Sequence, residues 1–131
     1  MSELKEIRDL NDIKTFIDTF YGKVREDELL KDIFNNVIND RWPQHLEKMY
    51  TFWQTILLNE HTYYGSPFLP HAQLPIDNSH FDRWRKLFFE TIDESFVGPT
   101  ANEAKWRADK MAEMFQTKIE HYRDTPSRPL I

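Results

Sequence analysis

The spacing of apolar residues predicts helices in the first half of the chain. One apolar set recurs at intervals of three, four and seven residues, comprising Ile13, Phe16, Ile17, Phe20, Tyr21 and Val24. These intervals place the set on one helix face, with Asn11 or Asp12 as the N-cap. A short helix is predicted around "DELLKDIFNNVI". "NDRWP" then begins a third helix, because Pro43 is tolerated only in a first turn, and its apolar stripe continues to about Leu58.

Two more helices are predicted beyond a proline-rich segment over residues 59–77. Asn78 or Ser79 caps the first, and Gly98 is its stop signal. Thr100 caps the last helix, which runs from about residue 101 to 122 and whose apolar alanines predict close contact with another helix. No stretch has the alternation typical of a strand. The pattern therefore predicts one all-α domain over residues 1–131, with a core at about 8–121 and a disordered tail at 122–131.

Composition and charge exclude several classes of function. A chain of 131 residues suits a single core. The net charge is −5, and acidic and basic residues are interspersed along the chain, so the basic patch of a nucleic-acid-binding protein is absent. No apolar run approaches the roughly 20 residues of a membrane helix, and the polar start "MSELKEIRDLND" argues against a secretory signal peptide. The chain has no cysteine, which excludes disulfides and thiolate ligands. We expect a cytoplasmic protein.

Three polar or amphipathic side chains fall on apolar faces. His45 precedes Met49, Phe52 and Trp53 at helical spacing and points with their buried stripe. Tyr21 and Trp84 lie on two other stripes. Taken singly, each is most simply a core residue whose polar atom has a hydrogen-bond partner.

His71 differs because it lies in the loop "GSPFLPHAQLP", where no helix face explains it. The three prolines stiffen this loop and would preorganise a metal ligand. The helix after His45 advances about 20 Å at ~1.5 Å per residue, and the dozen residues that follow reach at most about 40 Å. The chain can therefore double back and present His71 opposite His45, which suits haem. A non-haem metal site built from His45, His61, His71 and His80 stays open, although it lacks the spacing typical of helix-borne sites.

Four blocks of sequence carry a resemblance to a known family. They are "TFYGKVREDELLKDIFNNVI", "HLEKMYTFWQTILL", "YYGSPFLPHAQLP" and "HFDRWRKLFFETIDESF". In this order they resemble the truncated haemoglobins, and among these the third group, over about residues 8 to 120. The first two groups use paired glycines at two helix ends. This chain has three glycines and none paired, in agreement with the third group.

The resemblance implies a two-over-two helical sandwich around haem b. It assigns His71 as the proximal iron ligand, while His80 is a rival that reads as an ordinary residue near a helix start. Tyr21, His45 and Trp84 match the residues of the distal pocket, where the gas is bound. The residues expected to line the cofactor are Phe20, Phe34, Met49, Phe52, Leu74 and Phe81.

The resemblance also implies a haem protein that binds O2, NO or CO at a pentacoordinate iron. Two hydrogen-bond donors, the Tyr21 phenol and the Trp84 indole, favour slow release of O2 and therefore redox chemistry on the ligand. NO dioxygenation and peroxide reduction are the reactions expected first, with an unidentified electron donor. The alternative is reversible gas binding or sensing without turnover. A helical interaction module without haem is the third class.

Overall fold

The computed structural model describes residues 4–58 and 76–124, with the side chains of the last helix described as far as Ile119. Five helices make up these parts: α1 (Leu10–Glu26), α2 (Lys31–Ile38), α3 (Trp42–Leu58), α4 (Asn78–Ser95) and α5 (Pro99–Asp124). Within these two ranges there is no strand, only an isolated bridge between Lys5 and Phe96. The all-α prediction is therefore confirmed. No helix in the described part is long and apolar enough to cross a membrane.

The predicted N-caps are displaced from the observed ones by one to three residues. Asp9 caps α1 by accepting the backbone N–H of Asp12 at 3.0 Å. Asp77 caps α4 by accepting the N–H of Ser79 at 2.9 Å. Helix α5 begins at Pro99, whose missing N–H and fixed φ suit a first helical position. Apolar periodicity indicates the buried face of a helix but not the polar turn that precedes it. The predicted caps therefore lie after the observed ones in the sequence.

The N-terminal segment closes the start of α5. The Glu6 carboxylate accepts the backbone N–H groups of Thr100 at 3.0 Å and Ala101 at 2.9 Å. An anion is favoured at this end of a helix dipole. Gly98 lies beside the same carboxylate with φ +121°, and a Cβ at this position would be 2.3 Å from Glu6 Oε2. A glycine is therefore required at the turn between α4 and α5.

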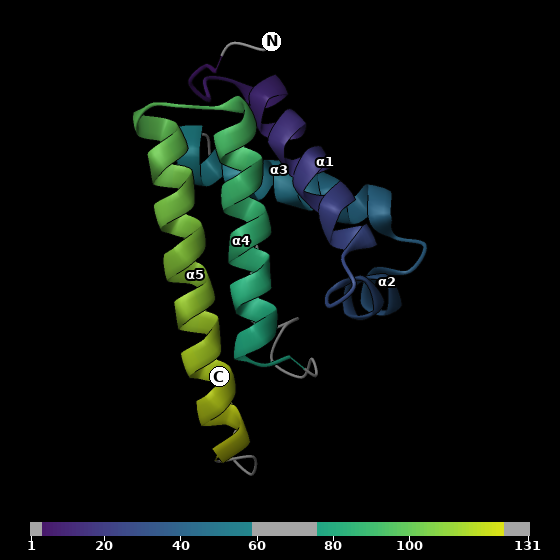
Figure 1. Ribbon diagram of the computed structural model, residues 1–131. Coiled ribbons are helices and arrows are strands. Elements are labelled where there is room, and N and C mark those ends of the chain that lie inside the picture. The colour runs from purple at the N-terminus through teal and green to yellow at the C-terminus, as the bar shows by residue number, and fades with distance from the viewer. Residues whose placement is uncertain (1–3, 59–75, 125–131) are drawn as a thin grey trace.

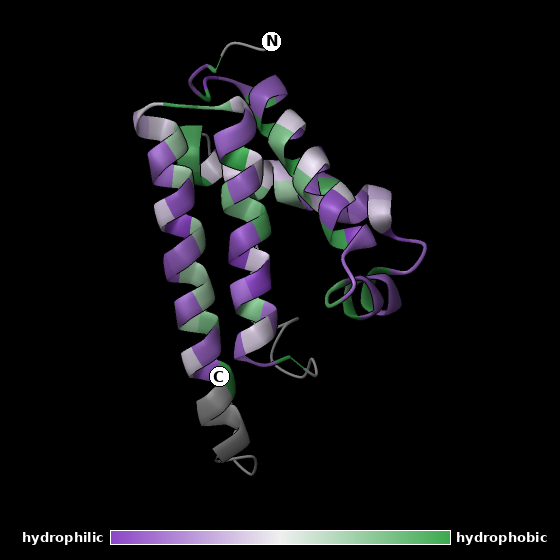
Figure 2. Cartoon of the chain, viewed as in Figure 1, coloured by the Kyte–Doolittle hydropathy of each residue, from purple (hydrophilic) through white to green (hydrophobic). Residues whose placement is uncertain are grey.

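The helices pack as two pairs. α4 and α5 lie side by side, α1 packs on α3, and α1 also packs on α4 (Figure 1). Hydrophobic and hydrophilic positions alternate along α4 and α5 (Figure 2), as expected for helices with one buried face. The alanines at 101, 104, 108 and 112 are buried, which permits the close approach that their spacing predicts. This agrees with the two-over-two arrangement that the family resemblance implies.

Candidate functional site

Tyr21 lies at the meeting point of three helices. Its ring, on α1, is 5.0 Å from the imidazole of His45 on α3, with the two planes at 87°. The indole of Trp42, also on α3, is 5.8 Å away, and the Phe34 ring on α2 is 6.2 Å away. Distances of this size between tilted rings are typical of edge-to-face aromatic packing. Side chains from α2 and α3 thus surround the phenol that α1 provides.

The Tyr21 hydroxyl is a protonated donor in this aromatic shell. The side chain is only 6% exposed, and burial raises the pKa of its phenol above the ordinary value. No described residue provides a hydrogen-bond partner for this hydroxyl. The hydroxyl can therefore donate to a small ligand that accepts a hydrogen bond.

His45 presents a buried nitrogen to the same region. The residue is half-buried, and its Nε2 atom is shielded from solvent. Its backbone N–H donates to the Arg41 carbonyl at 2.9 Å, within the first turn of α3. The expectation that His45 points with the buried stripe is confirmed.

Trp84 joins the Tyr21 region to a second apolar cluster. Its indole stacks on Phe88 at 5.5 Å and meets the edge of Phe20 at 5.5 Å. Phe20 in turn lies 4.9 Å from Tyr21. On its other side, Trp84 packs against a cluster that holds Ile76, Phe81, Ala112, Phe115 and Ile119. Trp84 is therefore linked to Tyr21 through Phe20.

The remaining predicted cofactor contacts occupy different surroundings. Phe34 and Met49 are half-buried against the main core. Phe52 is buried and packs on Trp53 at 5.4 Å. Phe81 belongs to the second cluster. His71, Leu74 and His61 lie outside the described residues, so the proximal ligand stays a prediction.

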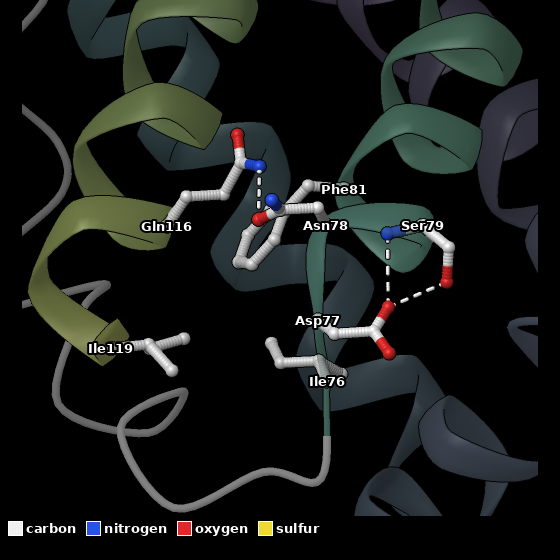
Figure 3. Close-up of a pocket in the computed structure, with 7 residues that line it drawn as sticks. All are labelled: Ile76, Asp77, Asn78, Ser79, Phe81, Gln116 and Ile119. Atoms are coloured by element: carbon white, nitrogen blue, oxygen red, sulfur yellow. Dashed lines mark hydrogen bonds between the residues drawn. The ribbon is translucent and has the colours of Figure 1, made fainter. Parts of the chain in front are cut away.

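A cavity of about 380 Å³ opens where α4 begins, next to the second cluster. Figure 3 shows Ile76, Phe81 and Ile119 as its apolar lining, and Gln116 donating to Asn78 Oδ1 at 2.7 Å across it. Because Phe81 lines this cavity, one predicted cofactor contact borders open space.

His80 has a structural role at the start of α4. Its Nδ1 accepts the backbone N–H of Asp77 at 3.0 Å, which completes a capping box with the Asp77 carboxylate. This supports the expectation that His80 is an ordinary helix-start residue. Among the described residues, no three or more His, Cys, Asp or Glu side chains are grouped to hold a metal ion.

An ion pair ties the corner between α1 and α2 to α4. Arg83, the residue before Trp84, approaches Asp27 Oδ1 with its Nη1 at 2.6 Å. Burial raises the pKa of the Asp27 carboxyl, but hydrogen bonds from Arg83 and from the N–H groups of Leu30 and Leu29 outweigh it. The pKa is therefore lower than usual. The ion pair fixes the helix that carries Trp84 relative to the start of α2.

Two residues of this region, Trp42 beside Tyr21 and Arg25 over the Trp42 ring, are not predicted as part of the site. Trp42 was interpreted only as part of a helix start, and Arg25 was given no role. Helical spacing gives only a partial signal: Trp42 precedes His45 by three residues and Arg25 follows Tyr21 by four, but neither interval shows that Trp42 and Arg25 meet.

Comparisons with known proteins agree with this architecture. The family described as bacterial-like globin matches residues 7–120. A group 3 truncated haemoglobin (ctb) of Campylobacter jejuni subsp. jejuni is 35% identical over 114 residues, which cover 84% of this chain and 90% of the relative. The crystal structure of a group III truncated haemoglobin from Campylobacter jejuni aligns with a TM-score of 0.82 and 33% identity. That alignment covers 89% of this chain and 95% of the other.

Proposed function

This chain belongs to the bacterial-like globin family, and from that premise we propose that it binds haem b and a diatomic gas. In this proposal, His71 is the iron ligand, and Tyr21, His45 and Trp84 surround the gas. The observation that carries the proposal is the Tyr21 side chain, which is 6% exposed, protonated, and bears a hydroxyl without a hydrogen-bond partner among the described residues.

The residues present fit a haem pocket. Phe34 and the ring of Tyr21 offer flat apolar surface, which suits a planar macrocycle. Haem bound here supplies an iron that coordinates a gas and exchanges electrons with it. The proximal side rests on His71 by resemblance. The α3–α4 connection that carries this residue follows Leu58, at the end of the helix on which His45 lies.

The distal side chains determine how firmly the gas is held. Tyr21 Oη donates a hydrogen bond to a gas ligand that carries partial negative charge, and the Nε1–H of Trp84 is a second donor. The surrounding apolar rings lower the local dielectric constant, which strengthens both interactions. Because His45 Nε2 is buried beside Tyr21, this nitrogen can bond the ligand or a water molecule that precedes it.

A protein that releases O2 slowly is better suited to a reaction of the bound O2 than to O2 transport. We propose NO dioxygenation, in which NO, O2 and one electron give nitrate, the electron coming from an external one-electron reductant such as a reduced flavoprotein. Both atoms of O2 enter the product, so no proton is consumed. The residues that retain O2 therefore give NO time to react. The expected cytoplasmic location stays a prediction.

The purified protein reconstituted with haem b tests the proposal in two steps. A Soret band and reversible CO binding are expected first, and their absence would show that the chain is not a haem protein. NO consumption is then measured electrochemically with O2, NADPH and a flavin reductase, with nitrate as the product. Haem binding with no NO or peroxide turnover would instead establish reversible gas binding or sensing.

A further inference from the structure

The outer face of Trp42 carries a cation from the neighbouring helix. The Arg25 guanidinium on α1 lies 4.5 Å from the centroid of the Trp42 ring. Arg25 follows Tyr21 by four residues, so both project from the same side of α1. Two side chains one turn apart on α1 therefore contact the same indole, Arg25 over its face and Tyr21 at its edge.

Trp42 also contacts His45 on its own helix. The two rings are 5.7 Å apart with their planes at 88°. Tyr21, Trp42 and His45 thus form a closed set of three rings, in which each contacts the other two. Movement of the Trp42 ring would remove one wall from both the phenol and the imidazole.

Open space on one side makes such movement possible. Trp42 lines a surface cleft of about 550 Å³ together with Gly22, Arg25, Glu26, Asn35 and Asn39. Trp42 is only 6% exposed. On the cleft side, the described residue that covers the face of its ring is Arg25, which is itself exposed. The cation–π contact therefore opposes rotation of the ring into the cleft.

We propose that Arg25 and Trp42 are positioning residues, which hold the Tyr21 phenol and the His45 imidazole in one arrangement toward the gas. This inference rests on the proposed haem function, because it concerns the distal side of the same site. Neither residue contacts the gas in this account. Both act through Tyr21 and His45, and Arg25 acts from the protein surface.

The test compares Arg25→Met and Trp42→Leu in the haem-loaded ferrous protein. The C–O stretching band of the CO complex reports polar groups near the ligand, and O2 release is followed by stopped flow. Wild type is expected to show one narrow band, and both variants a second or broadened band. Arg25→Met should accelerate O2 release about two- to fivefold, the value of one exposed cation–π contact. Trp42→Leu should accelerate it about five- to tenfold, as expected for a lost hydrogen bond.

The chain provides a matched control at a distant surface. Arg107 lies 5.6 Å from the ring of Trp106, which is 54% exposed on α5. Arg107→Met and Trp106→Leu should leave both the band and O2 release unchanged. Arg25→Met alters an exposed side chain and carries the test if Trp42→Leu does not fold.

A variant that lacks both polar groups distinguishes a positioning role of Arg25 from a role in packing alone. When both polar groups are removed by Tyr21→Phe and His45→Leu, adding Arg25→Met should have no further effect on O2 release. A persistent effect, or a wild-type band in Arg25→Met and Trp42→Leu, would overturn the inference while leaving the haem function intact. A wild-type protein that binds no haem would overturn the proposed function itself, and this inference with it.

Discussion

Replacement of Tyr21 by phenylalanine should change gas release strongly and stability little. The substitution removes one hydroxyl and almost no volume from a side chain that is 6% exposed. Because no described residue is hydrogen-bonded to this hydroxyl, its removal leaves no donor or acceptor of the described protein unpaired. We therefore expect the free energy of unfolding of the haem-free protein to stay within about 1 kcal/mol of wild type.

The effect on O2 follows from the same hydroxyl. A net hydrogen bond of about 1–1.5 kcal/mol corresponds to roughly a five- to tenfold change in affinity. Most of it should appear as faster O2 dissociation, since the bond forms only after the gas has arrived. CO accepts hydrogen bonds poorly and should respond much less.

Stopped-flow displacement of O2 and flash photolysis of CO, measured on the same Tyr21→Phe preparation, decide between the possibilities. Equal changes for the two gases would show that Tyr21 acts as a steric gate. If the free energy of unfolding in urea fell by several kcal/mol while O2 release stayed unchanged, the hydroxyl would be a structural group and not a donor to the gas.

Four other substitutions, one of them paired with a control substitution, test separate parts of the structure and of the proposed site. His71→Ala should lose haem or bind it weakly, and an unchanged ferrous spectrum would contradict the proximal assignment. Trp84→Phe removes an N–H donor, so O2 release should become several-fold faster. The free energy of unfolding measured in urea should fall by about 1–2 kcal/mol. Gly98→Ala should destabilise by at least about 1 kcal/mol, since its Cβ would overlap Glu6. Gly22→Ala, which meets nothing within 4 Å in mid-helix, is its control and should gain about 0.5–1 kcal/mol. Burial raises the pKa of Asp12, but hydrogen bonds from Lys5 and Arg8 outweigh it and leave the pKa lowered. The ionised Asp12 carboxylate therefore stabilises the fold fully above about pH 4, and this stabilisation is lost as pH falls through the pKa of the folded state. The Asp12→Asn variant should accordingly lose less stability than wild type on acidification, as measured by urea unfolding at several pH values.

Helical periodicity was sufficient to predict the helices and the all-α class, whereas the two-over-two arrangement was implied by the family resemblance. The stripe from Ile13 to Val24 is buried throughout α1, and Pro43 lies in the first turn of α3. Helix starts were less predictable, because they depend on side chains outside the apolar stripe. Asp12, predicted as a possible N-cap, is instead buried inside α1 and pairs with Lys5 at 2.6 Å. No pattern along the chain indicates that Glu6 caps a helix that begins 93 residues later at Pro99.

The candidate site was predictable only where a polar group stood on an apolar face. Tyr21 and His45 satisfied this criterion, and the structure brings their rings to 5.0 Å. Trp42 did not, because a tryptophan at a helix start needs no explanation beyond core packing. Its contact with Arg25 depends on how α1 and α3 cross, and helix crossing is a tertiary property that spacing within one helix does not specify.

A polar group on an apolar face is also the reason why the proposed function centres on Tyr21. Elsewhere in α1, apolar side chains are buried and the carboxylates that are buried have partners, as with Asp12 and Lys5. Tyr21 breaks this consistency by placing a hydroxyl in a shell of rings without a described partner. A local departure of this kind lowers stability unless a ligand compensates for it. If haem and a gas fill the site, the hydroxyl gains the acceptor that the described part of the chain does not provide, and ligand binding stabilises the fold around it.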